Sequence, residues 1–277
     1  MSRFIKTVRG LGSLFRNPWL LNVVLAQDET AWQRRIQAHT MRHQLTADGL
    51  PVLPLTALLP ATGETVQPFA FRDGGSLPTD LALLRALARR VPTCRYFEIG
   101  TWRGESAANV AAVAASVHTL NLSAGEMRAL GLAERYIELH GFFSRPLPNV
   151  THLHGNSATY DLASLQQQFD LIFIDGDHRY EAVRTDTHRV FENVVGPTTA
   201  VVWHDASRQP GQPRWEVLAG ILDGLPSNAT GQLVQVENTL CALYLPVASS
   251  ILVTTPARVP EPLANPVPSF SVTVRAL

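Results

Sequence analysis

From Pro78 onward, short apolar segments alternate with helical ones, and this alternation most limits the folds open to the chain. The expected strands are Arg95–Ile99, Val117–Leu122, Val150–His154, Leu171–Asp175 and Ala200–Trp203, with a closing hairpin at Leu233–Val236 and Cys241–Leu245. Helices are expected from Pro78, over Ser106–Ala115 and over Tyr180–Asn193. Buried strands that alternate with helices predict an α/β fold with a mostly parallel sheet covered on both faces.

Composition supports a folded protein without a nucleic-acid partner. Of the 277 residues, 45% are hydrophobic and 17% are charged, which is typical of a globular chain. The formal net charge is zero, so no basic surface for nucleic acid is indicated. The two cysteines, Cys94 and Cys241, belong to no CxxC motif and fit a reducing cytoplasm. We expect an arm over 1–75, a main domain over 76–246 and a proline-rich tail over 247–277.

The arm begins with a basic amphipathic pattern. Phe4, Val8, Leu11 and Phe15 recur at helical spacing among arginines and a lysine. Such a helix either packs on the main domain or contacts a membrane surface peripherally. No apolar run reaches the roughly 20 residues that span a bilayer. Phe270–Val274 is a candidate edge strand, and oligomerisation is left open.

The segment Phe97–Ser106 is the first candidate site. An apolar strand runs into Gly100 and Gly104 and then into a helix, a turn that brings backbone N–H groups up to a ligand. The spacing is not GxGxxG, which argues against a dinucleotide. The carboxylate of Glu98 suits a ligand with a cationic amino group. The alternative is an ordinary strand–helix turn.

Ionisable residues follow two further strands. Asp175, Asp177 and His178 come directly after one buried strand, and His204 and Asp205 follow the next. Ligands of open α/β sheets bind beyond the carboxyl ends of the strands, so these groups are expected to meet there. Carboxylates that converge with a histidine can hold a divalent ion. The alternatives are turn-forming acids, a helix cap and a buried histidine with its hydrogen bonds satisfied.

Together, Tyr96–Ser106, Asp170–Asp186 and Trp203–Asp205 resemble the class I methyltransferases that depend on S-adenosylmethionine (SAM). Within these, the chain is similar to the bacterial small-molecule and sugar O-methyltransferases that carry an FIDGDHxYE segment. The resemblance covers about residues 78–245. It implies a Rossmann-like sheet of seven strands, of which the last is antiparallel, and SAM as the cofactor.

The resemblance also assigns residues. Those matching the methionine end of SAM are Glu98, Gly100, Thr101, Gly104 and Ser106. Asn121 stands where relatives offer an acid to the ribose, and Asn156 and Ser157 lie where adenine is expected. Asp175, His204 and Asp205 match the ligands of a divalent metal, Mg²⁺ or another, although imidazole suits softer ions. His178 matches the general base, with Asp177 as its rival.

Three functions compete. The first is methyl transfer from SAM to a hydroxyl of a sugar or another small molecule. The second is a hydroxylase-like activity on the same fold, and the third is a non-catalytic protein that binds SAM or assists assembly. The acceptor itself is not revealed, because fold does not fix substrate. We expect variable loops within 20–75 and 206–230 to form its pocket.

Overall fold

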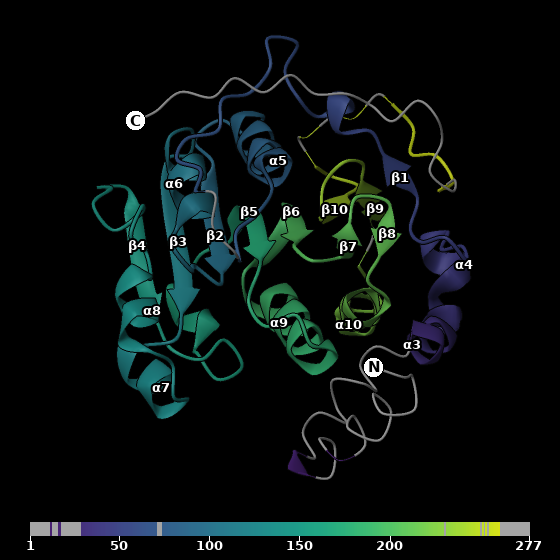
Figure 1. The fold of residues 1–277 in the computed structure, drawn as a ribbon. Coiled ribbons are helices and arrows are strands. Elements are labelled where there is room, and N and C mark those ends of the chain that lie inside the picture. The colour runs from purple at the N-terminus through teal and green to yellow at the C-terminus, as the bar shows by residue number, and fades with distance from the viewer. Residues whose placement is uncertain are drawn as a thin grey trace, which may run out of the picture.

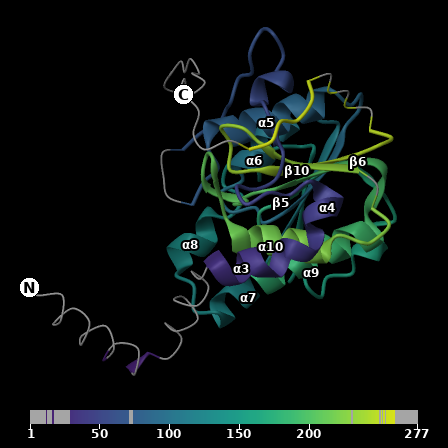
Figure 2. The same cartoon turned by 90° about the vertical axis from the view of Figure 1, so that its right-hand side faces the viewer.

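A computed structural model of the chain contains an eight-stranded sheet between two layers of helices (Figures 1 and 2). It describes residues 12, 16–17, 29–70, 74–229, 231–249, 251, 253 and 255–260. The strands of this sheet are β1 (Val52–Leu53), β2 (Arg95–Ile99), β3 (Ser116–Asn121), β4 (Val150–His154), β5 (Phe169–Ile174), β6 (Val195–Trp203), β9 (Gly231–Val236) and β10 (Ala242–Pro246). A separate hairpin joins β7 (Ser207–Gln209) to β8 (Gln212–Pro213).

The sheet has the strand order β1-β9-β10-β6-β5-β2-β3-β4. Its ladders are parallel except where β10 runs antiparallel to both β6 and β9. The predicted α/β class, with a mostly parallel sheet and an antiparallel last strand, is therefore confirmed. The strand count differs by one, because the arm adds β1 at the edge, where Val52 pairs with Gln235. A two-residue strand is too short to show a periodicity in the sequence.

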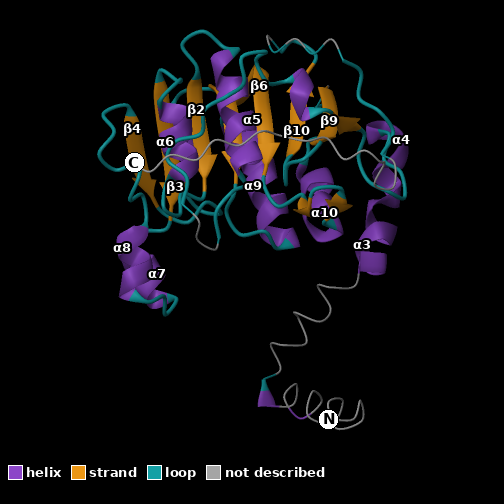
Figure 3. Ribbon diagram, turned by 45° about the horizontal axis from the view of Figure 1, so that its top comes forward, coloured by secondary structure: helices purple, strands orange, loops and turns teal. Residues whose placement is uncertain are grey.

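Helices cover both faces (Figures 2 and 3). The helices are α3 (Glu29–Ile36), α4 (Thr40–His43), α5 (Pro78–Arg89), α6 (Glu105–Ala111), α7 (Ala124–Ala129), α8 (Glu134–Leu139), α9 (Tyr180–Asn193) and α10 (Trp215–Gly224), with short 3₁₀ turns at Gln37–His39, Leu55–Ala57 and Leu162–Leu165. Helices α5 and α6 lie on one face, and α9 and α10 lie on the other. The arm helix α3 packs on α10.

Alternating side chains of the central strands build two cores. On β5, Ile172 and Ile174 face the core beneath α9 and α10, and Leu171 and Phe173 face the core beneath α5 and α6. All four are essentially inaccessible to solvent. This burial on both faces explains why the strand is a continuous apolar run rather than an alternating one. The strand ends, and the residues that follow them, are fixed in space by this packing.

One expected loop region is largely a core element. We expected residues 206–230 to contribute variable acceptor loops, but they contain the β7–β8 hairpin and the buried helix α10. Gly220 and Gly224 let this helix approach α9: a Cβ on Gly220 would lie 2.8 Å from Cβ of Val183, and one on Gly224 would lie 2.7 Å from the carbonyl oxygen of Arg184. Two glycines lower the intrinsic helix propensity of α10, so this helix is stabilised by its tertiary packing.

The predicted helix around Phe4–Phe15 and the predicted strand Phe270–Val274 lie outside the described residues. The division into arm, main domain and tail stays a prediction. Among the described residues, no helix combines the length and the apolar character required to cross a membrane.

Candidate active site

The turn after β2 is built by two glycines in the left-handed region of backbone space. Gly100 has φ +92° and Gly104 has φ +81°. A Cβ on Gly100 would lie 2.0 Å from the carbonyl oxygen of Asp175, and one on Gly104 would lie 2.2 Å from Oγ of Ser144. The two glycines therefore serve the contact of chain with chain, in addition to any approach to a ligand. Their packing also joins the turn to the end of β5.

Three buried polar atoms of this turn, one each from Glu98, Thr101 and Trp102, have no hydrogen-bond partner among the described residues. Oε2 of Glu98 accepts a hydrogen bond from the hydroxyl of Tyr96 at 2.8 Å, but Oε1 has no partner. Oγ1 of Thr101 also has none. Burial raises the pKa of Glu98 to about 8, and the nearby hydroxyls of Tyr96 and Ser106 oppose that rise only in part. Unpaired buried polar groups are rare in proteins, so these atoms make the turn a candidate site for a polar ligand.

The remaining expected cofactor residues lie at the ends of β3 and β4. The carbonyl oxygen of Asn121 accepts a hydrogen bond from N–H of Gly155 at 2.9 Å, and its side-chain oxygen lies 3.5 Å from the backbone nitrogen of Thr101. Asn156 is exposed and its Oδ1 accepts from the N–H of Ala158. The backbone oxygen of Ser157, which is half-buried, accepts from Arg189 at 2.9 Å. These residues thus share one edge of the sheet with the glycine turn.

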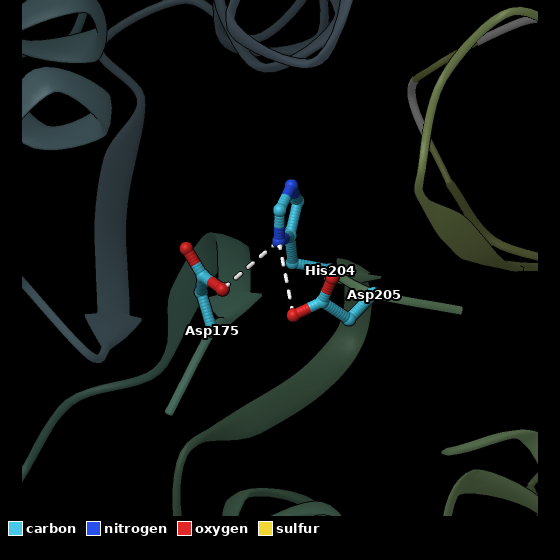
Figure 4. A group of neighbouring side chains, drawn as sticks. All are labelled: Asp175, His204 and Asp205. Atoms are coloured by element: carbon cyan, nitrogen blue, oxygen red, sulfur yellow. Dashed lines mark ion pairs between the residues drawn. The ribbon is translucent and has the colours of Figure 1, made fainter. Parts of the chain in front are cut away.

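The expected metal ligands meet at the ends of β5 and β6 (Figure 4). Nδ1 of His204 lies 3.1 Å from Oδ1 of Asp175 and 3.7 Å from Oδ2 of Asp205. One ligand atom from each of the three residues lies within 4.8 Å of the others. Nδ1 is buried and makes no hydrogen bond of good geometry among the described residues, although it faces both carboxylates. The donor set suits a divalent ion that accepts both nitrogen and oxygen.

Electrostatics of the cluster follow from its three charges. Burial acts to lower the pKa of His204, but the charge of Asp175 and contacts with Asp205 and Asp80 raise it well above its usual value. Burial raises the pKa of Asp175. Burial acts in the same sense on Asp205, yet His204, His178 and nearby Arg214 bring its pKa below the usual value. The carboxylates therefore favour the charged form of His204.

The room available at this point is small. A cavity of about 10 Å³ is lined by Ile174, Asp175, Gly176, Asp177, His178, Val183, Trp203, His204 and Asp205. That volume admits about one water-sized particle. A single ion fits such a space, whereas a methyl acceptor must approach from the solvent side of the cluster.

The two expected proton acceptors are both exposed but differ in their partners. Nδ1 of His178 lies 3.4 Å from Oδ2 of Asp205, and its side chain is 53% exposed. Asp177 pairs with Arg179, whose backbone N–H and guanidinium both donate to the carboxylate. Burial acts to raise the pKa of Asp177, but these contacts bring it below its usual value. A carboxylate held in this way is a weaker base than an imidazole.

Asp80 was missed by sequence reasoning. It lies in the first turn of α5, is completely buried, and its Oδ2 lies 3.1 Å from Nε2 of His204. The same side chain accepts the N–H groups of Leu77 and Leu240. An acid in the first turn of a helix is ordinarily explained as a cap, so its position gave no further signal.

Trp102 was also missed, although it stands inside the glycine turn. Its ring stacks on Tyr136 with centroids 4.0 Å apart, and His140 lies edge-on to both rings. A hollow of about 440 Å³ is lined by Trp102, Arg135, Tyr136, Glu138 and Leu139. This volume is in the range of small-molecule sites, so a planar ring can be accommodated beside the turn.

Residues 97–206 match a family model described as a methyltransferase domain. That span is less than half of the chain, and it contains the glycine turn and the cluster at the ends of β5 and β6. A search of the curated proteins finds no match. The matched segment is thus similar to a methyltransferase domain over these residues.

Solved structures with a similar arrangement include three methyltransferases. The first is the S-adenosylhomocysteine-bound methyltransferase PaMTH1 of Podospora anserina, at 20% identity over 64% of this chain and 82% of that chain, with a TM-score of 0.47. The second is CalS11, a TDP-rhamnose 3'-O-methyltransferase of calicheamicin biosynthesis, at 15% identity over 62% and 80% with a TM-score of 0.42. The third is an O-methyltransferase from Bacillus cereus, at 17% identity over 83% and 96% with a TM-score of 0.42.

Proposed function

We propose that the protein is a SAM-dependent O-methyltransferase that acts on a hydroxyl of a sugar or another small molecule. One observation carries the proposal: the glycine turn and the cluster of Asp175, His204 and Asp205 are packed against each other. The N–H of Asp175 donates to the carbonyl of Ile99 at 2.8 Å, directly before Gly100. A methyl donor on the turn and an acceptor at the cluster would thus be neighbours.

For the cofactor, the turn offers a cradle of suitable chemistry. Unpaired Oε1 of Glu98 and Oγ1 of Thr101 are available to the methionine end of SAM, next to Gly100, Gly104 and Ser106. A nearby ammonium group would favour the ionised form of Glu98. Asn121 would hydrogen-bond the ribose, and Asn156 and Ser157 would lie near adenine. SAM supplies the methyl group on its sulfonium.

His178 would act as the general base. Oδ2 of Asp205, 3.4 Å from Nδ1, would orient the ring and leave Nε2 to take the proton from the acceptor hydroxyl. Asp177 is the weaker candidate because Arg179 holds it. Asp175, His204 and Asp205 would hold a divalent ion, Mg²⁺ or a softer one, which lowers the pKa of a coordinated hydroxyl.

The test is a methyl-transfer screen with labelled SAM against a panel of sugars, nucleotide sugars and phenols, read by mass spectrometry. We expect one class of acceptor to gain a methyl group as S-adenosylhomocysteine forms. Asp175→Asn should lower turnover and metal affinity together. Full activity after EDTA treatment would remove the ion from the proposal, and hydrolysis of SAM without any methylated product would contradict methyl transfer.

A further inference from the structure

The imidazole of His204 is held from both sides by carboxylates. Nδ1 faces Asp175 and Asp205, as Figure 4 shows, and Nε2 faces Asp80 at 3.1 Å. The His204 side chain is 7% exposed and Asp80 is fully buried. The ring is therefore fixed in orientation by residues from three separate parts of the chain.

The two ring nitrogens of His204 differ in their hydrogen bonding. Nε2 and Asp80 form a hydrogen bond, whereas buried Nδ1 makes none among the described residues despite its short distance to Asp175. A carboxylate can only accept, so Asp80 selects the tautomer with its proton on Nε2. With the Nε2 proton held by Asp80, loss of the Nδ1 proton would leave the Nδ1 lone pair facing the space between Asp175 and Asp205.

We propose that Asp80 is a positioning residue that holds His204 as a nitrogen ligand, so that this site prefers a first-row transition-metal ion over Mg²⁺. The inference rests on the metal site of the proposed function. Metal-bound histidines commonly donate their other N–H to a carboxylate, which fixes the ring and strengthens the ligand. One imidazole with two carboxylates is a mixed donor set, whereas Mg²⁺ prefers oxygen alone.

Asp80 also stabilises the fold. Its oxygens accept the N–H groups of Leu77 at 2.7 Å and Leu240 at 2.9 Å. A substitution at this position therefore changes stability whether or not a metal binds. Only a change in metal preference distinguishes a positioning role from a structural one.

The experiment titrates the full-length protein with Co²⁺, followed by its visible d–d absorption, and with Mg²⁺ as competitor. Wild type should bind Co²⁺ more tightly than Mg²⁺. Asp80→Asn should weaken Co²⁺ binding about 10–100-fold. His204→Asp should shift preference toward Mg²⁺, and in that background Asp80→Asn should have no further effect on metal affinity.

The matched control is Glu192→Gln, which breaks another histidine–carboxylate pair, that with His188 at 3.2 Å on the exposed side of α9. It should leave Co²⁺ affinity unchanged. Circular dichroism and thermal melting identify folded variants, and Asp80→Ser, whose hydroxyl can still cap α5, is the second variant. If neither Asp80 variant folds, His204→Asp and His204→Asn test whether the imidazole sets the preference for Co²⁺ over Mg²⁺. An unchanged preference in both would then overturn the inference.

Three results would overturn the inference. These are no Co²⁺ binding by wild type, Co²⁺ affinity within about twofold of wild type in Asp80→Asn, or an equal Asp80→Asn effect in the His204→Asp background. The first also removes the metal from the proposed function. The other two leave that function standing, and failure to bind SAM would leave the metal inference standing.

Discussion

The glycine turn and the acidic cluster lie side by side at one edge of the sheet, but their buried polar groups have different charged neighbours. In the turn, buried oxygens of Glu98 and Thr101 have no partner among the described residues. In the cluster, buried Nδ1 of His204 also makes no hydrogen bond among the described residues, but the carboxylates of Asp175 and Asp205 face it at 3.1 and 3.7 Å. The turn therefore contains buried oxygens that no cation or donor in the described part of the chain faces, whereas the imidazole of the cluster faces carboxylates on both sides. A cofactor would fill the first, but a metal must displace a proton at the second.

The largest effect is expected where the two regions touch. Gly100→Ala places a Cβ 2.0 Å from the backbone oxygen of Asp175 at φ +92°. We expect a loss of about 4 kcal/mol or more in the free energy of unfolding, or no folded protein. Chemical denaturation measures it. Gly131→Ala is the matched control, because Gly131 has φ +77° and nothing within 4 Å of a Cβ, so only about 1 kcal/mol is expected.

The second effect concerns chemistry alone. His178→Ala should lower turnover about 10²–10⁴-fold while SAM affinity stays unchanged, since the side chain is exposed and lies at the acceptor side of the cluster. Asp177→Asn should cost much less. Single-turnover kinetics with an identified acceptor gives both values. Near-normal turnover in His178→Ala would transfer the role of base to Asp177.

The third effect is the pH dependence of stability that Glu98 in the glycine turn contributes. The pKa of Glu98 is about 8 in the folded protein, against an ordinary value of 4.5, so the folded state binds this proton more tightly. Its stabilising contribution is complete below about pH 4.5 and is lost as pH rises through 8. Each pKa unit corresponds to about 1.4 kcal/mol. Glu98→Gln should remove several kcal/mol of this pH dependence in unfolding experiments. An unchanged slope would show that the pKa of Glu98 does not differ between the folded and unfolded states.

Much of the fold could be predicted because its central elements are locally consistent. Arg95–Ile99, Val150–His154 and Tyr180–Asn193 have the bounds expected from their apolar patterns. Strand β1 and helix α10 could not be predicted, because one is two residues long and the other contains glycines that only its contact with α9 explains. Local sequence carries no record of such tertiary contacts.

The residues of the candidate site also fall into those that the sequence predicted and those that it did not. The sequence alone predicted that Asp175, His204 and Asp205 lie close together, because each follows a strand of a parallel sheet. Asp80 could not, since it reaches His204 from a helix 124 residues earlier. The roles of Gly100 and Gly104 were predicted only in part, because their closest neighbours, Asp175 and Ser144, belong to distant segments.

The smallest effect is expected from the start of the chain. Removal of residues 1–17 should leave SAM affinity unchanged, because the turn is formed by β2, β5 and the segment around Ser144. Calorimetry on the truncated and full-length proteins makes the comparison. A folded truncation that no longer binds SAM would place part of the cofactor site in the arm.

The most direct test of the central claim is calorimetric titration of the full-length protein with SAM and with S-adenosylhomocysteine, with NAD as the comparison ligand. The account predicts saturable binding of both sulfur compounds at the glycine turn and no competition by NAD. Gly104→Val should lose binding, and this counts only if circular dichroism shows a folded variant, because a Cβ there would lie 2.2 Å from Oγ of Ser144. Absence of SAM binding up to millimolar concentration in the folded wild-type protein would contradict it.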